Sequence, residues 1–570
     1  MKRSFFHDLW RLVRPFWVSE EKWKAFALLG VVIGITVGMV YLNVQFNAWY
    51  GRFYNALQAL DQAIFWQEMA MFTILAAINV AGVVSGAFVR QLLRIRWRHW
   101  LTDHYMSMWL SHRSYYVLQT RGAATTDNPD QRIQEDTDLF VAQTESLFTG
   151  LLDSVLTLFA FSVILWNISG TFIIPGTDIA VPGDMFWAAL GYAIVGTWLT
   201  HLVGRPLIGI NYMMYKVNAD FRYSMVRVRE NAEGIALYGG ERDERATLDD
   251  RFQAVVTNWW TYMLRALRVN MLTAAYNQAA VVFPFLITQG RFFAGEIPLG
   301  TLMQASNSFG EVQRALSFFV NAYSTLADWR ANVDRLTTFT RAMDEIRRAE
   351  QDQRDIARAP SANSNQLTVS GLDLALPEGT VLQRNLNVTV AQGDSLLIRG
   401  PSGVGKSTFF RALAGLWPFG KGRIDLPSHG TPLFLPQKPY LPLGALRMVV
   451  AYPGAAQHYS DEQIREVLNA VGLSHLVGRL DESRNWGQML SLGEQQRIAF
   501  ARALLLQPAW IYLDEATSQL DEESEGKLYT LLRRRLPQAA IVSIGHRATL
   551  AQYHDRHVTF GAPPSTMAAE

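Results

Sequence analysis

The stretch SLLIRGPSGVGKST, residues 395–408, decides the fold of the second half of the chain. SLLIR is a short apolar run of the kind that forms a buried strand, and the glycine-rich loop after it opens into a helix. In that setting the loop amides and the helix N-terminus face the phosphates of a nucleotide, Lys406 reaches the terminal ones, and Ser407 offers a hydroxyl to Mg²⁺. We therefore expect an α/β domain with a P-loop whose phosphate-binding residues are Gly400, Ser402, Gly403, Gly405, Lys406, Ser407 and Thr408.

A second hydrophobic strand, in WIYLDEATSQLD (510–521), supplies the acidic residues that accompany such a loop. Asp514 at its end is predicted to hold the metal, and Glu515 to orient or deprotonate the attacking water. The interval between the two motifs leaves room for an inserted helical subdomain, and LSLGEQQR (490–497) lies in it. Ser491 and Gly493 stand where a helix is expected to begin, so this stretch is a second motif suited to phosphate.

The composition indicates a membrane protein. Charged residues make up 18% of the 570 positions and aromatic residues 12%, with 17 tryptophans, which is poor in charge and rich in rings for a soluble protein. The net charge of +2 gives no argument for a nucleic-acid partner. The absence of cysteine excludes disulfides, thiolate metal sites and cysteine nucleophiles.

Apolar runs of about 20 residues, long enough to cross a bilayer, are confined to the first half of the chain. The clear ones are 24–42, 69–89, 147–166 and 186–204, and two weaker ones are 271–290 and 301–328. The last contains Glu311 and Arg314, which are three residues apart and can pair on one helical face. We expect six transmembrane helices, and for the last two a helix buried in a soluble core is the alternative.

Basic residues are concentrated before the first run and in the long loops that follow the second and fourth runs. By the positive-inside rule, the N-terminus and both loops lie in the cytoplasm, and six crossings return the second half there, where ATP is. SFFHDLWRLVRPFWVS (4–19) has apolar residues at helical spacing with charged residues opposite, which predicts an interfacial helix. The expected parts are a transmembrane domain at 1–340, a linker at 341–362 and a nucleotide-binding domain at 363–570.

The stretch from about 365 to 550 resembles the ATPase domain of ATP-binding-cassette (ABC) proteins. Gln437 in FLPQKPYLP resembles the Q-loop glutamine, LSLGEQQR the signature, SQLD (518–521) the D-loop, and His546 in SIGHR the switch histidine. The resemblance implies catalytic roles for Glu515, His546 and Gln437, and a Mg²⁺ held by Ser407, Gln437 and Asp514. ATP and Mg²⁺ are the implied cofactors.

In that family two ATPase domains bind head to tail, so that each ATP lies between one P-loop and the signature of the other subunit. Ser491, Gly493 and Asp521 are then expected to contact the nucleotide of the partner. Because the chain has one copy of each motif, it resembles a half-transporter that works as a homodimer, and a heterodimer remains open. The signature has Leu492 and Glu494 where glycine and glutamine are usual, and Leu376 stands where an aromatic ring would stack on adenine.

The chain resembles the SbmA/BacA-like proteins that carry a fused ATPase domain, and the peroxisomal half-transporters related to them. The resemblance rests on LSLGEQQR, FLPQKPYLP and GLWPFG (415–420) in the second half. In the first half it rests on IRWRHWLTDHYMSMWL (95–110), DNPDQRIQED (127–136) and ENAEGIALYGGERDE (230–244). It implies an exporter-type ABC fold, in which an all-α six-helix transmembrane domain is fused to an α/β P-loop ATPase domain, in the cytoplasmic (inner) membrane. The polar segments are candidates for coupling the domains, through Asp130, Arg132, Glu233 and Glu241, and local capping of long helices is the alternative.

The expected function is ATP-driven transport, and the resemblance implies import of peptides or other hydrophilic cargo such as cobalamin. The expected partners are a second copy of the chain, membrane lipids and cargo, with no nucleic acid. Asp153 lies deep in an apolar run, where an ionisable group is costly, so it is a candidate for contact with cargo or protons. Export of lipids or drugs remains an alternative, as does a membrane-anchored ATPase that regulates a partner without moving cargo.

Overall fold

The structure is a computed structural model that describes residues 5–120, 128–173, 180–318, 322–351, 356–361, 365–428 and 430–561. The chain divides into two compact units. The membrane unit comprises Met1–Met108 and Asn128–Arg341, and the ATPase unit comprises Trp109–Asp127 and Ala342–Glu570.

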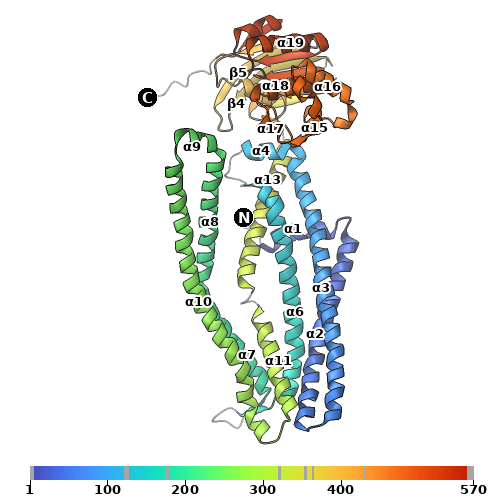
Figure 1. The fold of residues 1–570 in the computed structure, drawn as a ribbon, viewed down its shortest axis with the longest axis vertical. Coiled ribbons are helices and arrows are strands. Elements are labelled where there is room, and N and C mark those ends of the chain that lie inside the picture. The colour runs from blue at the N-terminus through green and yellow to red at the C-terminus, as the bar shows by residue number, and fades with distance from the viewer. Residues whose placement is uncertain are drawn as a thin grey trace. The chain divides into compact units, whose positions relative to one another are not determined.

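Long helices make up most of the membrane unit (Figure 1). They are α1 (Phe5–Trp17), α2 (Lys22–Gln58), α3 (Gln62–Leu110), α6 (Thr137–Ile168), α7 (Asp184–Gly204), α8 (Pro206–Glu230), α10 (Glu241–Phe293), α11 (Leu299–Leu316) and α13 (Tyr323–Gln351). The shorter elements are α5 (Pro129–Gln131), the π-helix η2 (Arg132–Asp136), α9 (Ala232–Tyr238) and the antiparallel strands β1 (Thr171–Ile173) and β2 (Ala180–Pro182). The 53 residues of α10 extend about 80 Å at about 1.5 Å per residue, far more than a bilayer's apolar core of about 30 Å. Such helices continue well beyond a membrane.

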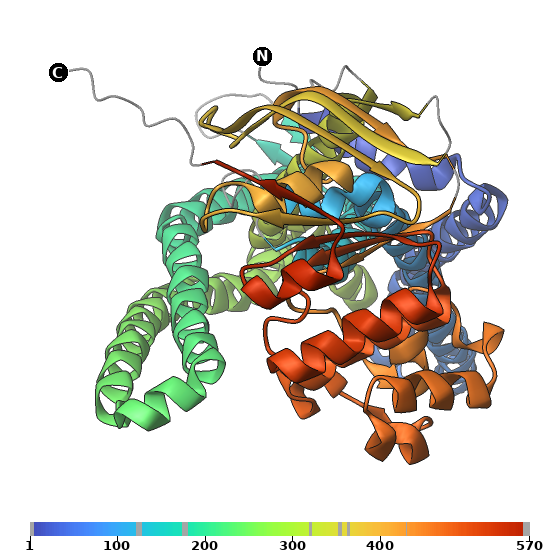
Figure 2. The same ribbon diagram turned by 90° about the horizontal axis from the view of Figure 1, so that it is seen from above.

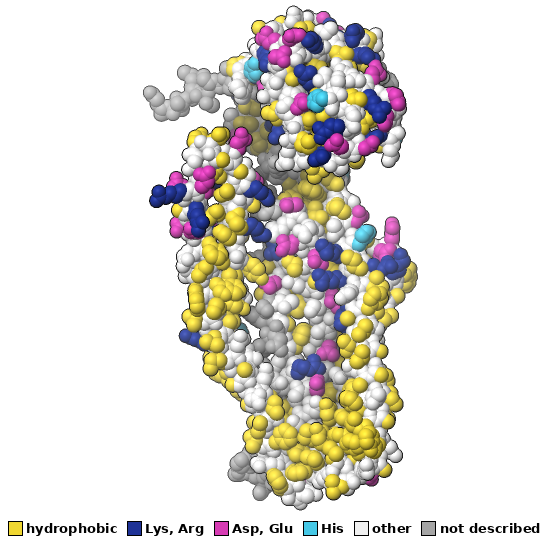
Figure 3. Space-filling model, in the orientation of Figure 1, with side chains coloured by type: hydrophobic (Ala, Val, Ile, Leu, Met, Phe, Trp, Pro, Cys, Tyr) yellow, Lys and Arg dark blue, Asp and Glu magenta, His cyan; other side chains and the backbone are white. Residues whose placement is uncertain are grey.

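Among the described residues, five helical segments are long and apolar enough to cross a membrane. They are Lys22–Gln58, Gln62–Thr120, Pro129–Ile168, Asp184–Glu230 and Glu241–Phe293, and each contains one of the first five predicted runs. Figure 3 shows hydrophobic side chains gathered over these helices toward the end of the unit where Figure 1 labels α7 and α11.

The sixth predicted span begins with α11, which has 18 residues and is not among those five segments. Residues 319–321 of that span lie outside the described part of the chain. α11 packs against α2, α6, α7 and α10, and its buried residues include Ala305, Phe309 and Val312. Because neighbouring helices cover it, α11 can carry more polar residues than a helix that faces lipid.

The predicted interfacial helix is α1, and Phe6 and Trp10 on it are 75% and 59% exposed. Its charged side is only partly free, however. Asp8 is buried and lies 2.6 Å from the guanidinium of Arg341 on α13, and Phe16 stacks on Trp97 of α3. Part of the face expected to meet water therefore packs within the unit, through partners that helical periodicity does not reveal.

α11 begins in close contact with the backbone of α2. Asn55 Oδ1 accepts a hydrogen bond of 2.9 Å from the amide of Gly300, and Gln58 Oε1 accepts one of 2.7 Å from the amide of Leu299. These side chains satisfy two of the amides that a helix N-terminus leaves without partners. A Cβ atom at Gly300 would lie 2.0 Å from the carbonyl oxygen of Gly51, so only glycine permits this approach.

The ATPase unit contains two large sheets and a two-stranded one, in which β9 (Gly444–Ala445) pairs antiparallel with β10 (Ser483–Arg484). The first has five parallel strands in the order β13 (Arg556–Thr559), β6 (Ser395–Arg399), β12 (Ala540–Ile544), β11 (Trp510–Asp514) and β8 (Pro432–Leu435). The second has the order β3 (Ile356–Pro360), β7 (Gly420–Leu426), β4 (Gln366–Ala375) and β5 (Val381–Ala391), where only β3 and β7 are parallel.

Helices cover the five-stranded sheet. They are α14 (Lys406–Leu413), α15 (Leu446–Ala451), α16 (Asp461–Ala470), α17 (Trp486–Met489), α18 (Leu492–Leu506) and α19 (Glu522–Arg535), with α4 (Ser114–Thr120) in the same unit. The strands alternate between two cores: Leu397 and Ile511 pack with the helical segment 446–506, and Leu396 and Tyr512 pack with the four-stranded sheet. Figure 2 shows these two parts, orange helices and yellow sheet, on opposite sides. The predicted helical insertion is therefore present between the P-loop and Asp514.

The segment 341–362, expected to be a linker, carries the last turns of α13, and residues 356–360 form β3 beside β7. Residues 352–355 lie outside the described part. The division between the units falls after Arg341, and β3 belongs to a sheet of the ATPase unit.

Replacing Gly300 by alanine should destabilise the membrane unit. The added methyl group meets the backbone of α2, and overpacking of this kind typically costs about 1–3 kcal/mol. We expect a clearly lower Tm for the purified protein in detergent. Gly310→Ala is the matched control on the same helix, because a Cβ there meets nothing within 4 Å. Equal Tm values for the two variants would contradict the close contact between α2 and α11.

Candidate functional site

The predicted P-loop connects β6 to α14. Gly400, Gly403 and Gly405 have φ angles of 150°, 79° and 98°, in the region that favours glycine. The ammonium of Lys406 donates hydrogen bonds of 2.8 Å to the carbonyl oxygens of Gly400 and Pro401. Burial lowers the pKa of Lys406, and the charges of Glu515 and Asp514 oppose that shift.

Parallel pairing brings the other predicted residues to the same edge of the sheet. β12 lies between β6 and β11, and β8 flanks β11. The segments that follow the carboxyl ends of these strands hold the P-loop, His546, Glu515 and Gln437, with Asp514 as the last residue of β11. This edge is where ligands bind in parallel α/β sheets.

A metal site is indicated by Ser407 and Asp514. The Ser407 hydroxyl donates to Asp514 Oδ1 over 3.0 Å, so the two oxygen atoms are close enough to share one cation. Burial raises the pKa of Asp514, and the hydrogen bond from Ser407 opposes that shift. Hydroxyl, carboxylate and the Gln437 amide are oxygen donors that suit Mg²⁺, which usually takes few protein ligands and completes its shell with phosphate and water.

Glu515 contacts the other two predicted catalytic residues, His546 and Gln437. Its Oε1 lies 3.1 Å from Nε2 of His546, and its Oε2 accepts a hydrogen bond of 3.1 Å from the amide nitrogen of Gln437. Its φ of 49° is unusual for a residue with a side chain and marks a strained backbone, as found at functional sites. A carboxylate held from both sides in this way can orient a water molecule or accept its proton.

The signature begins a well-capped helix. Ser491 is the N-cap of α18, and Ser491 and Glu494 form a capping box. A Cβ at Gly493 would lie 3.2 Å from the side chain of Leu520 and 3.3 Å from the carbonyl oxygen of Gln519. Glycine at 493 therefore lets the signature lie close to the D-loop.

Sequence reasoning missed Gln496, which joins three of the motifs. It is buried, donates hydrogen bonds to Gln437 O (2.9 Å) and Ser518 Oγ (3.2 Å), and accepts one from the amide of Gln519 (3.0 Å). The residue lies in LSLGEQQR, but nothing in that pattern shows that its amide reaches the Q-loop and the D-loop.

The D-loop residue Asp521 serves as the N-cap of α19. Its carboxylate accepts a hydrogen bond of 2.8 Å from the amide of Ser524, and hydrogen bonds from Ser524 lower its pKa. Arg547, next to His546, donates to the carbonyl oxygens of Leu520 and Ser518 at 2.6 and 3.3 Å. The switch and the D-loop are therefore tied together.

Leu376, expected near adenine, lies at the turn after β4. Its amide donates to Thr380 O over 2.8 Å, and its side chain packs against the core that contains the four-stranded sheet. Leu382 belongs to the same core and has its Cβ 3.2 Å from the Cβ position of Gly405. The side chain nearest to Gly405 is therefore aliphatic.

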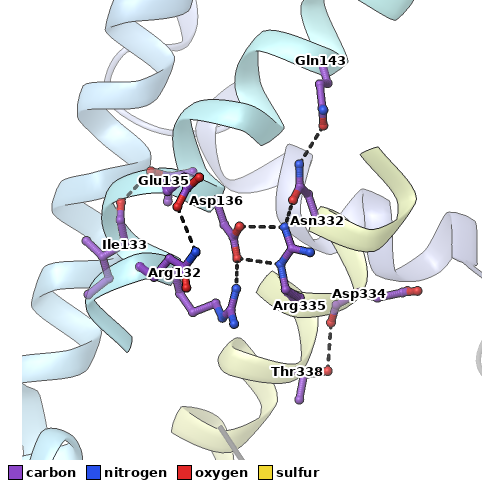
Figure 4. A network of polar contacts seen from close by, with 11 residues as sticks. Arg132, Ile133, Glu135, Asp136, Gln143, Asn332, Asp334, Arg335 and Thr338 are labelled. Atoms are coloured by element: carbon purple, nitrogen blue, oxygen red, sulfur yellow. Dashed lines mark hydrogen bonds and ion pairs between the residues drawn. The ribbon is translucent and has the colours of Figure 1, made fainter. Parts of the chain in front are cut away.

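The coupling candidates Asp130 and Arg132 lie in the membrane unit. Arg132 is paired over 2.5 Å with Asp136, which is 1% exposed and also accepts bonds of 3.0 and 2.8 Å from Arg335 on α13 (Figure 4). Asn332 extends the network to Gln143. Asp136 therefore ties the start of α6 to Arg335 of α13, and Arg132 supports Asp136 from its own segment. Asp130 is exposed.

The segment Trp109–Thr120 belongs to the ATPase unit. The sequence did not predict this, because the segment lies within the expected transmembrane domain. His112 and Arg113 have positive φ angles of 52° and 54°, so the chain turns sharply just after α3. The Arg113 guanidinium donates to the carbonyl oxygen of Ala414, at the end of α14. A cavity of about 380 Å³ lies beside this contact, lined by Leu110, His112, Arg113, Val117, Arg358, Gly415 and Leu416. This segment connects the helix α3 to the helix that follows the P-loop.

Glu233, in the first turn of α9, and Glu241, the first residue of α10, are exposed in the membrane unit. The pair expected within α11 is present: Arg314 Nε donates to Glu311 over 3.0 Å. Arg314 also lies 3.3 Å from Asp153 of α6. Asp153 is therefore part of a charged trio rather than a lone ionisable group.

A cavity of about 390 Å³ lies beside this trio, between α2, α3, α6 and α11. Its polar lining is Asn43, Asn79, Asn307 and Glu311, and its other residues are Phe46, Tyr50, Phe72, Ala76, Val80 and Phe161. Asn307 of α11 also donates a hydrogen bond of 2.9 Å to Asn47, a buried residue of α2.

Comparison with known proteins supports the expected family for both halves of the chain. Residues 13–293 match the family described as ABC transporter transmembrane region 2, and residues 383–518 match the family described as ABC transporter. The chain is 34% identical to the inner membrane ABC transporter ATP-binding protein YddA of Escherichia coli, over 94% of each protein. This chain belongs to the ABC transporter family.

This half-transporter is also 28% identical to the lysosomal cobalamin transporter ABCD4 of Homo sapiens, over 96% of the chain and 93% of that protein. The structure of a bacterial Atm1-family ABC exporter with ATP bound matches with a TM-score of 0.73 and 18% identity, covering 94% of each chain. The exporter-type fold expected from the sequence is confirmed. The protein is a multi-pass membrane protein that hydrolyses ATP, with Mg²⁺, to drive transport.

Replacing Glu515 by glutamine should lower kcat for ATP hydrolysis at least about 100-fold, because an amide cannot take a proton from water. ATP affinity should change by less than about twofold, since Glu515 is not placed among the phosphate ligands. Phosphate release and nucleotide binding by the purified protein measure the two quantities. Glu523→Gln, an exposed carboxylate on α19, is the control and should keep wild-type activity. An E515Q variant that keeps more than a tenth of the activity would show that Glu515 is not the catalytic carboxylate.

Proposed function

We propose that this half-transporter works as a homodimer in the cytoplasmic membrane and imports peptides or other hydrophilic cargo such as cobalamin-like molecules. The N-terminus and the ATPase unit lie in the cytoplasm in this proposal. The resemblance to SbmA/BacA-like proteins supports import of such cargo, and the name of the human relative, a cobalamin transporter, supports a hydrophilic cofactor as an alternative cargo.

The observation that carries the homodimer is the single copy of each phosphate-binding motif. The P-loop that carries Lys406 occurs once in the chain, and so does the signature that carries Ser491 at the N-terminus of α18. Head-to-tail pairing of two identical chains gives each ATP one P-loop and one signature, so two complete sites form. Ser491, Gly493 and Asp521 then contact the nucleotide that the other chain holds.

Each residue of the site has a distinct task in this proposal. Lys406 exchanges the carbonyl oxygens of Gly400 and Pro401 for the terminal phosphates. Ser407, Asp514 and Gln437 would hold Mg²⁺, which would neutralise charge on the phosphates. Glu515 orients the attacking water and takes its proton, and His546 holds Glu515 from its other oxygen.

Coupling uses two contacts. The segment Trp109–Thr120 joins α3 to the end of α14 through Arg113, so a shift of α14 when ATP binds is passed to a transmembrane helix. Glu233 and Glu241 flank Leu237 and Tyr238, which are 79% and 93% exposed at the end of α9. We assign this apolar tip to the ATPase unit of the partner, where it would be covered.

The cavity between α2, α3, α6 and α11 supports a hydrophilic cargo. Its asparagine amides and the Glu311 carboxylate supply donors and acceptors at the depth of apolar spans, where polar groups are costly unless they serve a pathway. The trio Asp153, Glu311 and Arg314 carries two carboxylates and one guanidinium, so protons or cargo can bind there.

Transport in sealed proteoliposomes tests the direction. With ATP supplied outside, only molecules whose ATPase units face outward are active, so a labelled peptide and a labelled cobalamin preloaded in the lumen are followed. Import predicts that the cargo leaves toward the ATP side with wild type and stays with Glu515→Gln. Cargo added outside that instead accumulates in the lumen would mean export, and lipids and drugs become the candidates. ATP hydrolysis that no cargo stimulates and that needs another protein would favour the regulatory ATPase.

A further inference from the structure

His475 contacts the signature from outside the family's motifs. It lies in the 3₁₀ helix η4 (Ser474–Arg479), between Leu473 and Leu476, which are each 1% exposed. Its Nε2 lies 3.0 Å from Oε1 of Glu494, and its side chain is 55% exposed. The buried neighbours fix the backbone of η4, so the ring is presented to α18 from a rigid base.

Glu494 uses its second oxygen on the N-cap. Oε2 accepts hydrogen bonds of 2.9 Å from the amide of Ser491 and 2.8 Å from the Ser491 hydroxyl. Burial raises the pKa of Glu494, but the donors on Ser491 and the charge of His475 outweigh it, and the net pKa is lowered. Glu494 therefore remains a carboxylate at neutral pH.

This arrangement conflicts with the expected task of Ser491. A hydroxyl has one proton, and here that proton is directed at Glu494 rather than outward. A carboxylate also repels the terminal phosphate of ATP, and the repulsion grows when dimer closure excludes water. The usual signature has a neutral glutamine at this position, whereas the negative charge of Glu494 has to be offset in this chain.

We propose that His475 is a positioning residue that offsets the charge of the Glu494 carboxylate beside the N-cap, so that Ser491 can donate its hydroxyl proton to the terminal phosphate of the partner's ATP. When it carries its proton, the imidazole donates to Oε1, offsets the carboxylate charge and weakens the competing hold on the Ser491 hydroxyl. Glu494 keeps its bond to the Ser491 amide, so α18 stays capped. This inference rests on the proposed assignment of Ser491 to the partner's nucleotide.

The test compares His475→Ala in two backgrounds. In the wild-type background we expect the KM for ATP to rise about fivefold, the typical net effect of one hydrogen bond, with kcat changed less than about twofold. In the Glu494→Gln background the same substitution should change KM by less than about 1.5-fold, because the charge that His475 offsets is absent. His475→Gln, which keeps a donor, should restore part of the loss. His458→Ala, an exposed histidine in the same helical segment, is the control and should leave KM unchanged.

Two further results separate the possible failures. A rise in KM that is equal in both backgrounds, or a fall in Tm with no change in KM, would mean a structural role and would overturn the inference. Ser491→Ala reports on the underlying assignment: if it leaves ATP hydrolysis intact, the role of Ser491 fails, whatever His475 does. If Ser491→Ala abolishes hydrolysis and His475→Ala changes nothing, the inference about His475 alone fails.

Discussion

The site depends on the parallel register of β6, β12, β11 and β8. Because these strands are parallel neighbours, the P-loop, His546, the Asp514–Glu515 pair and Gln437 all follow carboxyl ends at one edge of the sheet. Residues separated by more than a hundred positions in the chain come within hydrogen-bonding distance, as Ser407 and Asp514 do. In the proposed mechanism, the lysine and the loop amides at that edge bind phosphate, the oxygen donors hold Mg²⁺, and the doubly held carboxylate orients water.

The loops at this edge are connected to each other. Gln496 bonds to the Q-loop and the D-loop, and Arg547 ties the residue after the switch histidine to the D-loop. The Q-loop, the signature helix, the D-loop and the switch are therefore joined by side-chain hydrogen bonds. The same logic extends to Arg113, whose contact with the end of α14 gives the P-loop helix a path to α3. Each of these ties consists of one or two hydrogen bonds between elements.

Much of the site could be predicted from the sequence because it lies in short motifs with strong local constraints. The glycines of the P-loop need positive φ angles, and Asp514 and Glu515 must follow a hydrophobic strand, so residue order alone reveals them. Gln496, Arg113 and His475 could not be found in this way, because their roles come from contacts with distant segments. Likewise, Asp153 reads as a lone charge in an apolar run, yet Arg314 lies beside it, 161 positions further along the chain.

Hydropathy predicted five spans well. It predicted the sixth less well, again because contacts with distant segments do not show in the local sequence. A helix that faces lipid must be apolar, whereas α11 is covered by four other helices and carries Glu311, Gln313 and Arg314. Periodicity likewise placed α1 but did not show that Asp8 pairs with Arg341. In each case a long-range partner, absent from the local pattern, changes what a position requires.

The central claim is that each ATP is shared between the P-loop of one chain and the signature of another, and mixed dimers test it most directly. Chains carrying Lys406→Ala and chains carrying Ser491→Ala, both with Glu515→Gln to retain nucleotide, are co-expressed with different tags and the mixed dimer is isolated. Shared sites leave one intact site per mixed dimer, so one occluded ATP is expected, with none in either variant alone. A mixed dimer that occludes no more ATP than the two variants alone would contradict the account.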